Sequence, residues 1–114
     1  MGRDLSEMKC VACEGGIPPL SREEAERFLN DLPAGSGWRL SEDAKKISRE
    51  FAFKNFREAV AFVDRVADIA EQEGHHPDIK IFSYKKVLIE LSTHAIGGLS
   101  QNDFILAAKI GKMV

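Results

Sequence analysis

The 114-residue sequence has little cysteine: two residues, Cys10 and Cys13, which form a single C-x-x-C. A structural zinc site usually needs a second pair of ligands. A chain of this length forms one domain and can bury a core without disulfides or metal. We therefore interpret the two cysteines as thiols in an N-terminal arm over residues 1–20. A labile disulfide and a metal shared between subunits are the alternatives.

The sequence also lacks a basic excess, a long apolar run and a glycine-rich phosphate loop. Its formal net charge is -2 and its pI about 5.9, whereas direct nucleic-acid binding usually needs a basic face. No apolar run approaches the ~20 residues of a membrane span, and the opening "MGRDLSEMKC" has no apolar signal-peptide core. We therefore expect a cytoplasmic protein without a membrane or nucleic-acid partner.

Three spaced pairs of polar residues predict where helices begin. In each pair a serine or asparagine is followed three residues later by a glutamate or aspartate, which is the pattern of a helix cap and its partner. The pairs are Ser21–Glu24, Asn55–Glu58 and Ser100–Asp103. Apolar residues recur at helical spacing after each pair, so we expect a helix at each position.

Four segments between these helices have strand patterns. Residues 38–40 and 47–53 are typical of one hairpin, and residues 79–82 and 86–94 of a second. Hairpins imply antiparallel pairing, and the helices must cover one face of the sheet. We predict an α+β domain over residues 21–114 with the order α-β-β-α-β-β-α: a four-stranded antiparallel sheet with three helices packed on one face.

Two apolar surfaces exceed what a single chain needs. The segment "KVLIELS" at residues 86–92 is long and apolar for an exposed sheet edge, which favours pairing with its copy in a second subunit. The helix that begins near Phe56 has an apolar arc wider than one sheet face requires. This arc indicates either contact with another subunit or a deeply buried helix.

The stretch "EQEGHHPDIKIF", residues 71–82, places two of the three histidines side by side. Gly74 can adopt the left-handed conformation that ends a helix, and Pro77 restricts His76 to extended backbone. His75 therefore leaves from a helix end and His76 from an extended residue. We expect their side chains to diverge, with both directions fixed by the backbone.

The third histidine, His94, and Asp103 fall at the ends of predicted elements that flank the same strands. Imidazole has an ordinary pKa of about 6.5 and can give or take a proton at neutral pH. Each residue taken alone has a structural explanation, such as a charge at a helix end, and their grouping favours acid–base catalysis. Because adjacent extended residues such as His75 and His76 point to opposite sides, they would chelate one ion poorly, and we predict no metal.

The spacing of these residues resembles that of the pterin-4a-carbinolamine dehydratases. Three residues separate Glu71 from "HHP", six separate Pro77 from Tyr84, nine separate Tyr84 from His94, and eight separate His94 from Asp103. "GW" at residues 37–38, "FKNFREAVAFVDRVA" and the closing helix extend the resemblance over about residues 21–113.

The resemblance implies the same fold, with homodimers joined through sheet edges and often paired into homotetramers through the long helix. It implies a hydro-lyase that dehydrates 4a-hydroxytetrahydropterin to quinonoid dihydropterin, in the recycling of a cofactor such as tetrahydrobiopterin. This reaction needs an acid at the leaving hydroxyl and a base near N5. It needs no metal and no organic cofactor.

The resemblance also implies roles for individual residues. His75 and His94 would donate the proton to the leaving hydroxyl, whereas His76 would position the pterin and is a candidate acceptor of the N5 proton. The other implied site residues are Pro77, Ser92, Thr93 and Ala95 around the substrate, with Glu71 and Asp103 as supports that orient the imidazoles.

Two positions depart from animal members of the family. Ala95 stands where an acidic residue often follows "STH", and Ile79 stands where an aromatic residue follows "HHP". These departures bear on the detail of the pocket rather than on the core chemistry. The alternative functions are a non-catalytic dimerisation module of the coactivator type and a homologue that acts on another pterin, for instance in molybdopterin metabolism.

Overall fold

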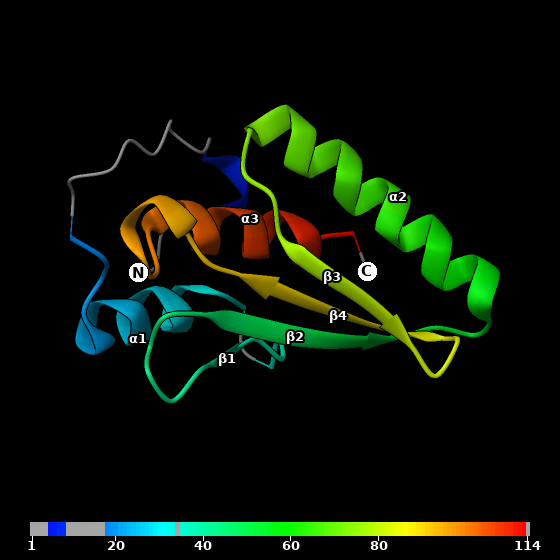
Figure 1. The fold of residues 1–114 in the computed structure, drawn as a ribbon, viewed down its shortest axis with the longest axis horizontal. Helices are drawn as coiled ribbons and strands as arrows, with labels where there is room; N and C mark the ends of the chain where they lie inside the picture. Colours follow the sequence, from blue (N-terminus) through cyan, green and yellow to red (C-terminus); the bar gives the residue numbers. More distant parts are fainter. Residues whose placement is uncertain (1–4, 9–17, 34, 114) are drawn as a thin grey trace.

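The computed structural model describes residues 5–8, 18–33 and 35–113. Its elements follow the predicted order (Figure 1). They are η1 (Leu5–Glu7), α1 (Arg22–Asp31), β1 (Arg39–Leu40), β2 (Ile47–Ala52), α2 (Phe56–Glu73), β3 (Asp78–Phe82), β4 (Lys86–Leu91), η2 (His94–Ile96) and α3 (Gln101–Gly111). The predicted α+β class, with three helices packed on one face of a four-stranded antiparallel sheet, is confirmed.

The predicted caps begin the helices because they satisfy backbone N–H groups that have no partner within the helix. At α1, the Glu24 backbone donates to Ser21 Oγ at 3.2 Å, and the Ser21 backbone donates to Glu24 Oε1 at 2.9 Å. At α2, the Glu58 backbone donates to Asn55 Oδ1 at 2.8 Å. The Glu58 carboxylate accepts from the Lys54 backbone at 3.1 Å, one residue before the expected partner.

The strand order in the sheet is β1-β2-β4-β3, with every neighbouring pair antiparallel. The expectation that "KVLIELS" forms an edge is therefore wrong. β4 is a central strand, hydrogen-bonded to β2 on one side and β3 on the other. Its apolar composition has a simpler cause, because Val87, Ile89 and Leu91 are fully buried under the helices. The edges of the sheet are β1 and β3.

The core lies between the inner face of the sheet and the helices α2 and α3, which Figure 1 shows along one side of the sheet. Phe51 on β2 meets Phe62 on α2 with ring centroids 4.7 Å apart. On the outer part of α2, however, Phe56 is 55% exposed and Val63 is only half-buried. The wide apolar arc is therefore not explained by a helix buried all round in this chain.

Part of the predicted N-terminal arm belongs to this core. Leu5 in η1 is 1% exposed and packs within the hydrophobic cluster. Closer to α1, the Leu20 backbone donates to the Leu99 carbonyl at 2.8 Å. Cys10 and Cys13 lie outside the described residues. None of the described helices is long and apolar enough to span a membrane.

Candidate active site

The corner between α2 and β3 has the predicted backbone conformation. Gly74 follows the last residue of α2 with φ 67° and ψ 27°, in the left-handed region where a side chain costs free energy. The His75 N–H returns to the Ala70 carbonyl at 3.2 Å and closes the helix end. The corner therefore fixes where both histidines leave the chain.

His75 points into the protein, where a buried carboxylate holds it. Its Nε2 lies 2.6 Å from Asp103 Oδ1, and Asp103 is fully buried. The other carboxylate oxygen, Oδ2, accepts from Thr93 Oγ1 at 2.8 Å and from the Ser100 backbone at 2.9 Å. Thr93 has one hydroxyl proton and donates it to Asp103, so the Ser100 hydroxyl is the donor to Thr93 Oγ1, at 2.8 Å. Both Asp103 oxygens and the hydroxyls of Thr93 and Ser100 have partners, and this bonding fixes the orientation of the His75 ring.

His76 points the other way, into solvent. Its Nε2 lies 2.5 Å from Glu71 Oε2, and the two side chains are 62% and 76% exposed. Neighbouring histidines thus have one carboxylate each, one pair buried and the other at the surface. The predicted divergence of the two side chains is confirmed. Asp103 and Glu71 are placed, as expected for supports, against the imidazoles.

A pocket of about 260 Å³ lies between the corner and the segment after β4. We call it the histidine pocket. Its walls are Gly74, His75, His76, Ser92, Thr93, His94, Ala95 and Asn102. All three histidines and three of the four predicted substrate residues line it, whereas Pro77 is not among its walls. Asn102 was not predicted as a site residue, and Gly74 was predicted only as the end of the helix.

Asn102 could have been found from its position beside Asp103 in the first turn of α3. It is 4% exposed and contributes a side chain with both donor and acceptor groups. His94 also differs from expectation, because β4 ends at Leu91 and His94 opens the short helix η2. A bridge between Thr93 and Gly98 closes this loop and brings His94 to the pocket.

Within the described residues, no group of three or more histidine, cysteine, aspartate or glutamate side chains is arranged to hold a metal ion. Instead, Nε2 of His75 contacts Asp103 and Nε2 of His76 contacts Glu71. The arrangement can place several ionisable rings around a small planar ligand, with neutral hydrogen-bonding groups between them. Such an arrangement of side chains is suited to proton transfer.

Residues 18–113 match the family model described as pterin 4 alpha carbinolamine dehydratase. The chain belongs to this family. A protein of Nitrosomonas eutropha, provisionally named a pterin-4-alpha-carbinolamine dehydratase, is 50% identical over 111 residues, covering 97% of this chain and 94% of the relative. A protein of Rubrobacter xylanophilus with the same provisional name is 46% identical over 110 residues, covering 96% and 98%.

Two solved structures resemble the fold of this dehydratase family member. One is described as a transcriptional coactivator/pterin dehydratase from Brucella melitensis, with a TM-score of 0.74 and 30% identity, covering 83% of this chain and 97% of that one. The other is described as a pterin dehydratase-like protein that is a RuBisCO assembly factor in the alpha-carboxysome. Its TM-score is 0.57 at 26% identity, covering 68% of this chain and 88% of that one.

Proposed function

We propose that this protein is a hydro-lyase that converts 4a-hydroxytetrahydropterin into quinonoid dihydropterin and water, in the recycling of a tetrahydropterin. One observation carries the proposal: the three histidines of the chain line one pocket, and a fully buried aspartate orients one of them. The match to the dehydratase family and the similarly named relatives support it.

The reaction requires one proton to arrive and another to leave. The hydroxyl on C4a departs as water after it takes a proton, N5 loses its proton, and a C4a=N5 double bond forms. We assign the proton donation to His75 and His94, which reach the pocket from two segments, the end of α2 and the segment after β4. His76 positions the pterin and accepts the N5 proton, which its exposed ring can release to water. The substrate residues Ser92 and Thr93 would read the amide edge of the pterin through their backbone.

The roles of the two carboxylates follow from their contacts. Both carboxylate oxygens of Asp103 are bonded to His75, Thr93 and Ser100. Asp103 therefore acts by orienting the His75 ring rather than by contacting the pterin. Glu71 contacts His76, which is a wall residue of the pocket. In this proposal both are positioning residues. Ala95 and Pro77 contribute shape rather than charge.

A coupled assay tests the proposal. An aromatic amino-acid hydroxylase generates the carbinolamine, and its decay is followed with and without this protein. We expect decay well above the spontaneous rate, and the acceleration should scale with protein concentration. Decay at the spontaneous rate would refute the dehydratase activity for this pterin, and the same assay with other pterins would then test the related-substrate alternative.

A binding function is a second candidate, favoured by Phe56 on α2, which is 55% exposed, and by the half-buried Val63 on the same helix. The described roles of the two similar structures, coactivator and assembly factor, point in the same direction. We propose that this surface and the edge strand β3 join copies of the chain into a homodimer or homotetramer. Light scattering should find an oligomer at micromolar concentration, and a stable monomer would contradict this part of the proposal.

A further inference from the structure

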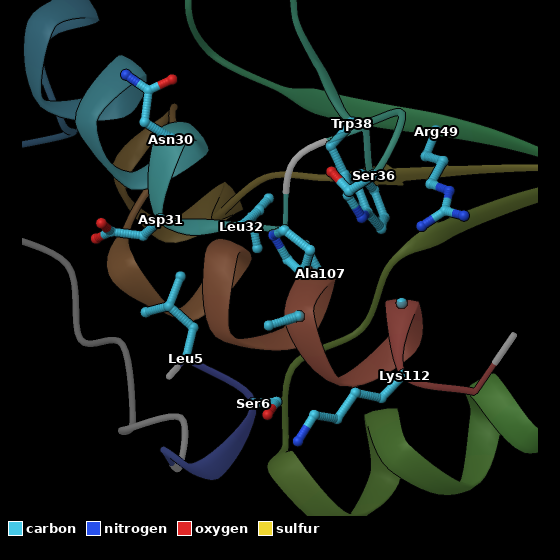
Figure 2. Close-up of a pocket in the computed structure, with 13 residues that line it drawn as sticks. Leu5, Ser6, Asn30, Asp31, Leu32, Ser36, Trp38, Arg49, Ala107 and Lys112 are labelled. Atoms are coloured by element: carbon cyan, nitrogen blue, oxygen red, sulfur yellow. The ribbon is translucent and has the colours of Figure 1, made fainter. Parts of the chain in front are cut away.

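A second cavity, of about 890 Å³, lies away from the histidine pocket and shares no wall residue with it. We call it the Arg49 cavity. It opens between the end of α1, the start of β1, β2 and the last turns of α3 (Figure 2). Leu5, Leu32, Trp38 and Ala107 give it apolar walls. Its volume is within the range of about 300–1,000 Å³ that small-molecule sites occupy.

Arg49 is a charged residue on an otherwise apolar face of the sheet, and it lines this cavity. It lies on β2 between Ile47 and Phe51, and in the sheet it is opposite Ile89. These neighbours form the apolar core, so Arg49 is a charged residue on the side of the sheet that the helices cover. Its guanidinium carbon lies 4.3 Å from the centroid of the Phe51 ring.

The Arg49 guanidinium has no anionic partner within the described part of the chain. None of the ion pairs formed there includes it. Asp31 is the carboxylate on the cavity wall, and Figure 2 shows it at the opposite side, turned away from Arg49. Partial burial lowers the pKa of the Arg49 guanidinium, because removing a cation from water costs free energy unless an opposite charge compensates it.

A structural role accounts for part of this arrangement. Arg49 Nη1 lies 3.5 Å from the position that a side chain on Gly111 would take, at the end of α3. A cation near a helix C-terminus is stabilising, because it interacts favourably with the helix dipole. A guanidinium has five N–H donors, however, and no hydrogen bond between described residues uses this one. The helix end therefore leaves most of the group available to the cavity.

We propose that the Arg49 cavity binds a small organic anion, with its carboxylate paired to Arg49 and an apolar body against Leu32, Trp38 and Ala107. Arginine suits this role because its planar fork matches a carboxylate. Lys112 is also a wall residue, but Figure 2 shows its side chain extending away from Arg49, so Arg49 is the cation that the carboxylate would meet. The site is independent of the histidine pocket and of the dehydratase activity proposed for it.

The cavity contains its own reporter, because Trp38 is the single tryptophan of the chain and is 6% exposed. Phenylbutyrate and its neutral amide form a matched pair of probes with the same apolar body. Titration of each, followed by Trp38 fluorescence, should give a dissociation constant at least about tenfold lower for the carboxylate, since a hydrogen bond to a charged group contributes more than one to a neutral group. Equal affinity for both probes, or binding of neither, would overturn the proposal.

Variants locate the binding and separate it from folding. Arg49→Met should abolish the preference for the carboxylate, while the amide binds as before. Arg49→Lys should keep part of the preference. Ala108→Leu, which fills the cavity from α3, should weaken both probes. His75→Asn should change neither. If a folded Arg49→Met protein keeps the tenfold preference, or if His75→Asn abolishes it, the anion does not bind at Arg49.

Discussion

His75 and His76 are neighbours in the chain, and each contacts a carboxylate, yet their environments are opposite. The His75–Asp103 pair is buried, and the second Asp103 oxygen accepts a hydrogen bond from Thr93. The His76–Glu71 pair lies in solvent, with His76 on the wall of the pocket. A buried pair held by further hydrogen bonds keeps one geometry, whereas an exposed pair is mobile and screened by water and salt. One ring is therefore held in a fixed geometry and the other is open to solvent, which under the proposed function suits the second ring to exchange protons with water.

The largest effect should come from removing the buried ring. His75→Ala should lower the rate of carbinolamine dehydration by about 10²–10⁴-fold, the usual contribution of a positioned acid or base. His76→Ala should lower it by only roughly tenfold, because water at the open side can take the N5 proton. Single-turnover kinetics measure both. Equal losses in the two variants would remove the functional contrast between the rings.

The next effect concerns stability rather than rate. Asp103→Asn should lower the free energy of unfolding by about 2–4 kcal/mol, since it removes a buried charge that accepts several hydrogen bonds. Urea denaturation measures the change. Thr93→Val, which removes one of those bonds and keeps the shape, is the matched control and should cost about 1–2 kcal/mol. A cost for Asp103→Asn no larger than that of Thr93→Val would show that the aspartate does not organise the network.

The corner that separates the two rings can be strained directly. Gly74→Ala should cost about 1–2 kcal/mol, because the left-handed backbone at φ 67° disfavours any residue with a Cβ. The added methyl group meets no other atom within 4 Å, so the cost comes from the backbone alone. Thermal unfolding of Gly74→Ala beside Gly74→Asn separates the causes, since asparagine tolerates this conformation better. An unchanged melting temperature in Gly74→Ala would contradict the assigned conformation.

The smallest effect should come from the exposed pair. Glu71→Gln should change the free energy of unfolding by less than about 0.5 kcal/mol, because surface ion pairs contribute little. It should still raise the KM for the pterin, since His76 loses the carboxylate that holds it. Steady-state kinetics at low and high salt would reveal this. A destabilisation as large as that of Asp103→Asn would erase the contrast between the two carboxylates.

Much of this contrast could be predicted from the sequence because it depends on local signals. Gly74 and Pro77 act on adjacent backbone, so the divergence of the histidines follows from neighbouring residues. The caps at Ser21 and Asn55 are similarly local. What the sequence could not provide is the depth of each ring, because the burial of Asp103 depends on how α3 packs against the sheet.

The errors have the same origin. The apolar pattern of β4 suits a central strand or an edge that pairs with another subunit, and only the strand order distinguishes them. Asn102 was missed because its approach to the pocket depends on the direction of α3. The Arg49 cavity was not foreseen either, although an arginine on an apolar strand face was visible between Ile47 and Phe51.

If the three imidazoles surround one pterin, as proposed, histidine-selective NMR should detect the contact at each ring. The ring signals of His75, His76 and His94 can be assigned with single substitutions and followed while a stable reduced pterin is added. The ring signals of all three histidines should shift with one common dissociation constant. The contact between His75 and Asp103 should persist throughout the titration. Pterin binding that leaves the His75 and His94 rings unperturbed would contradict the proposal.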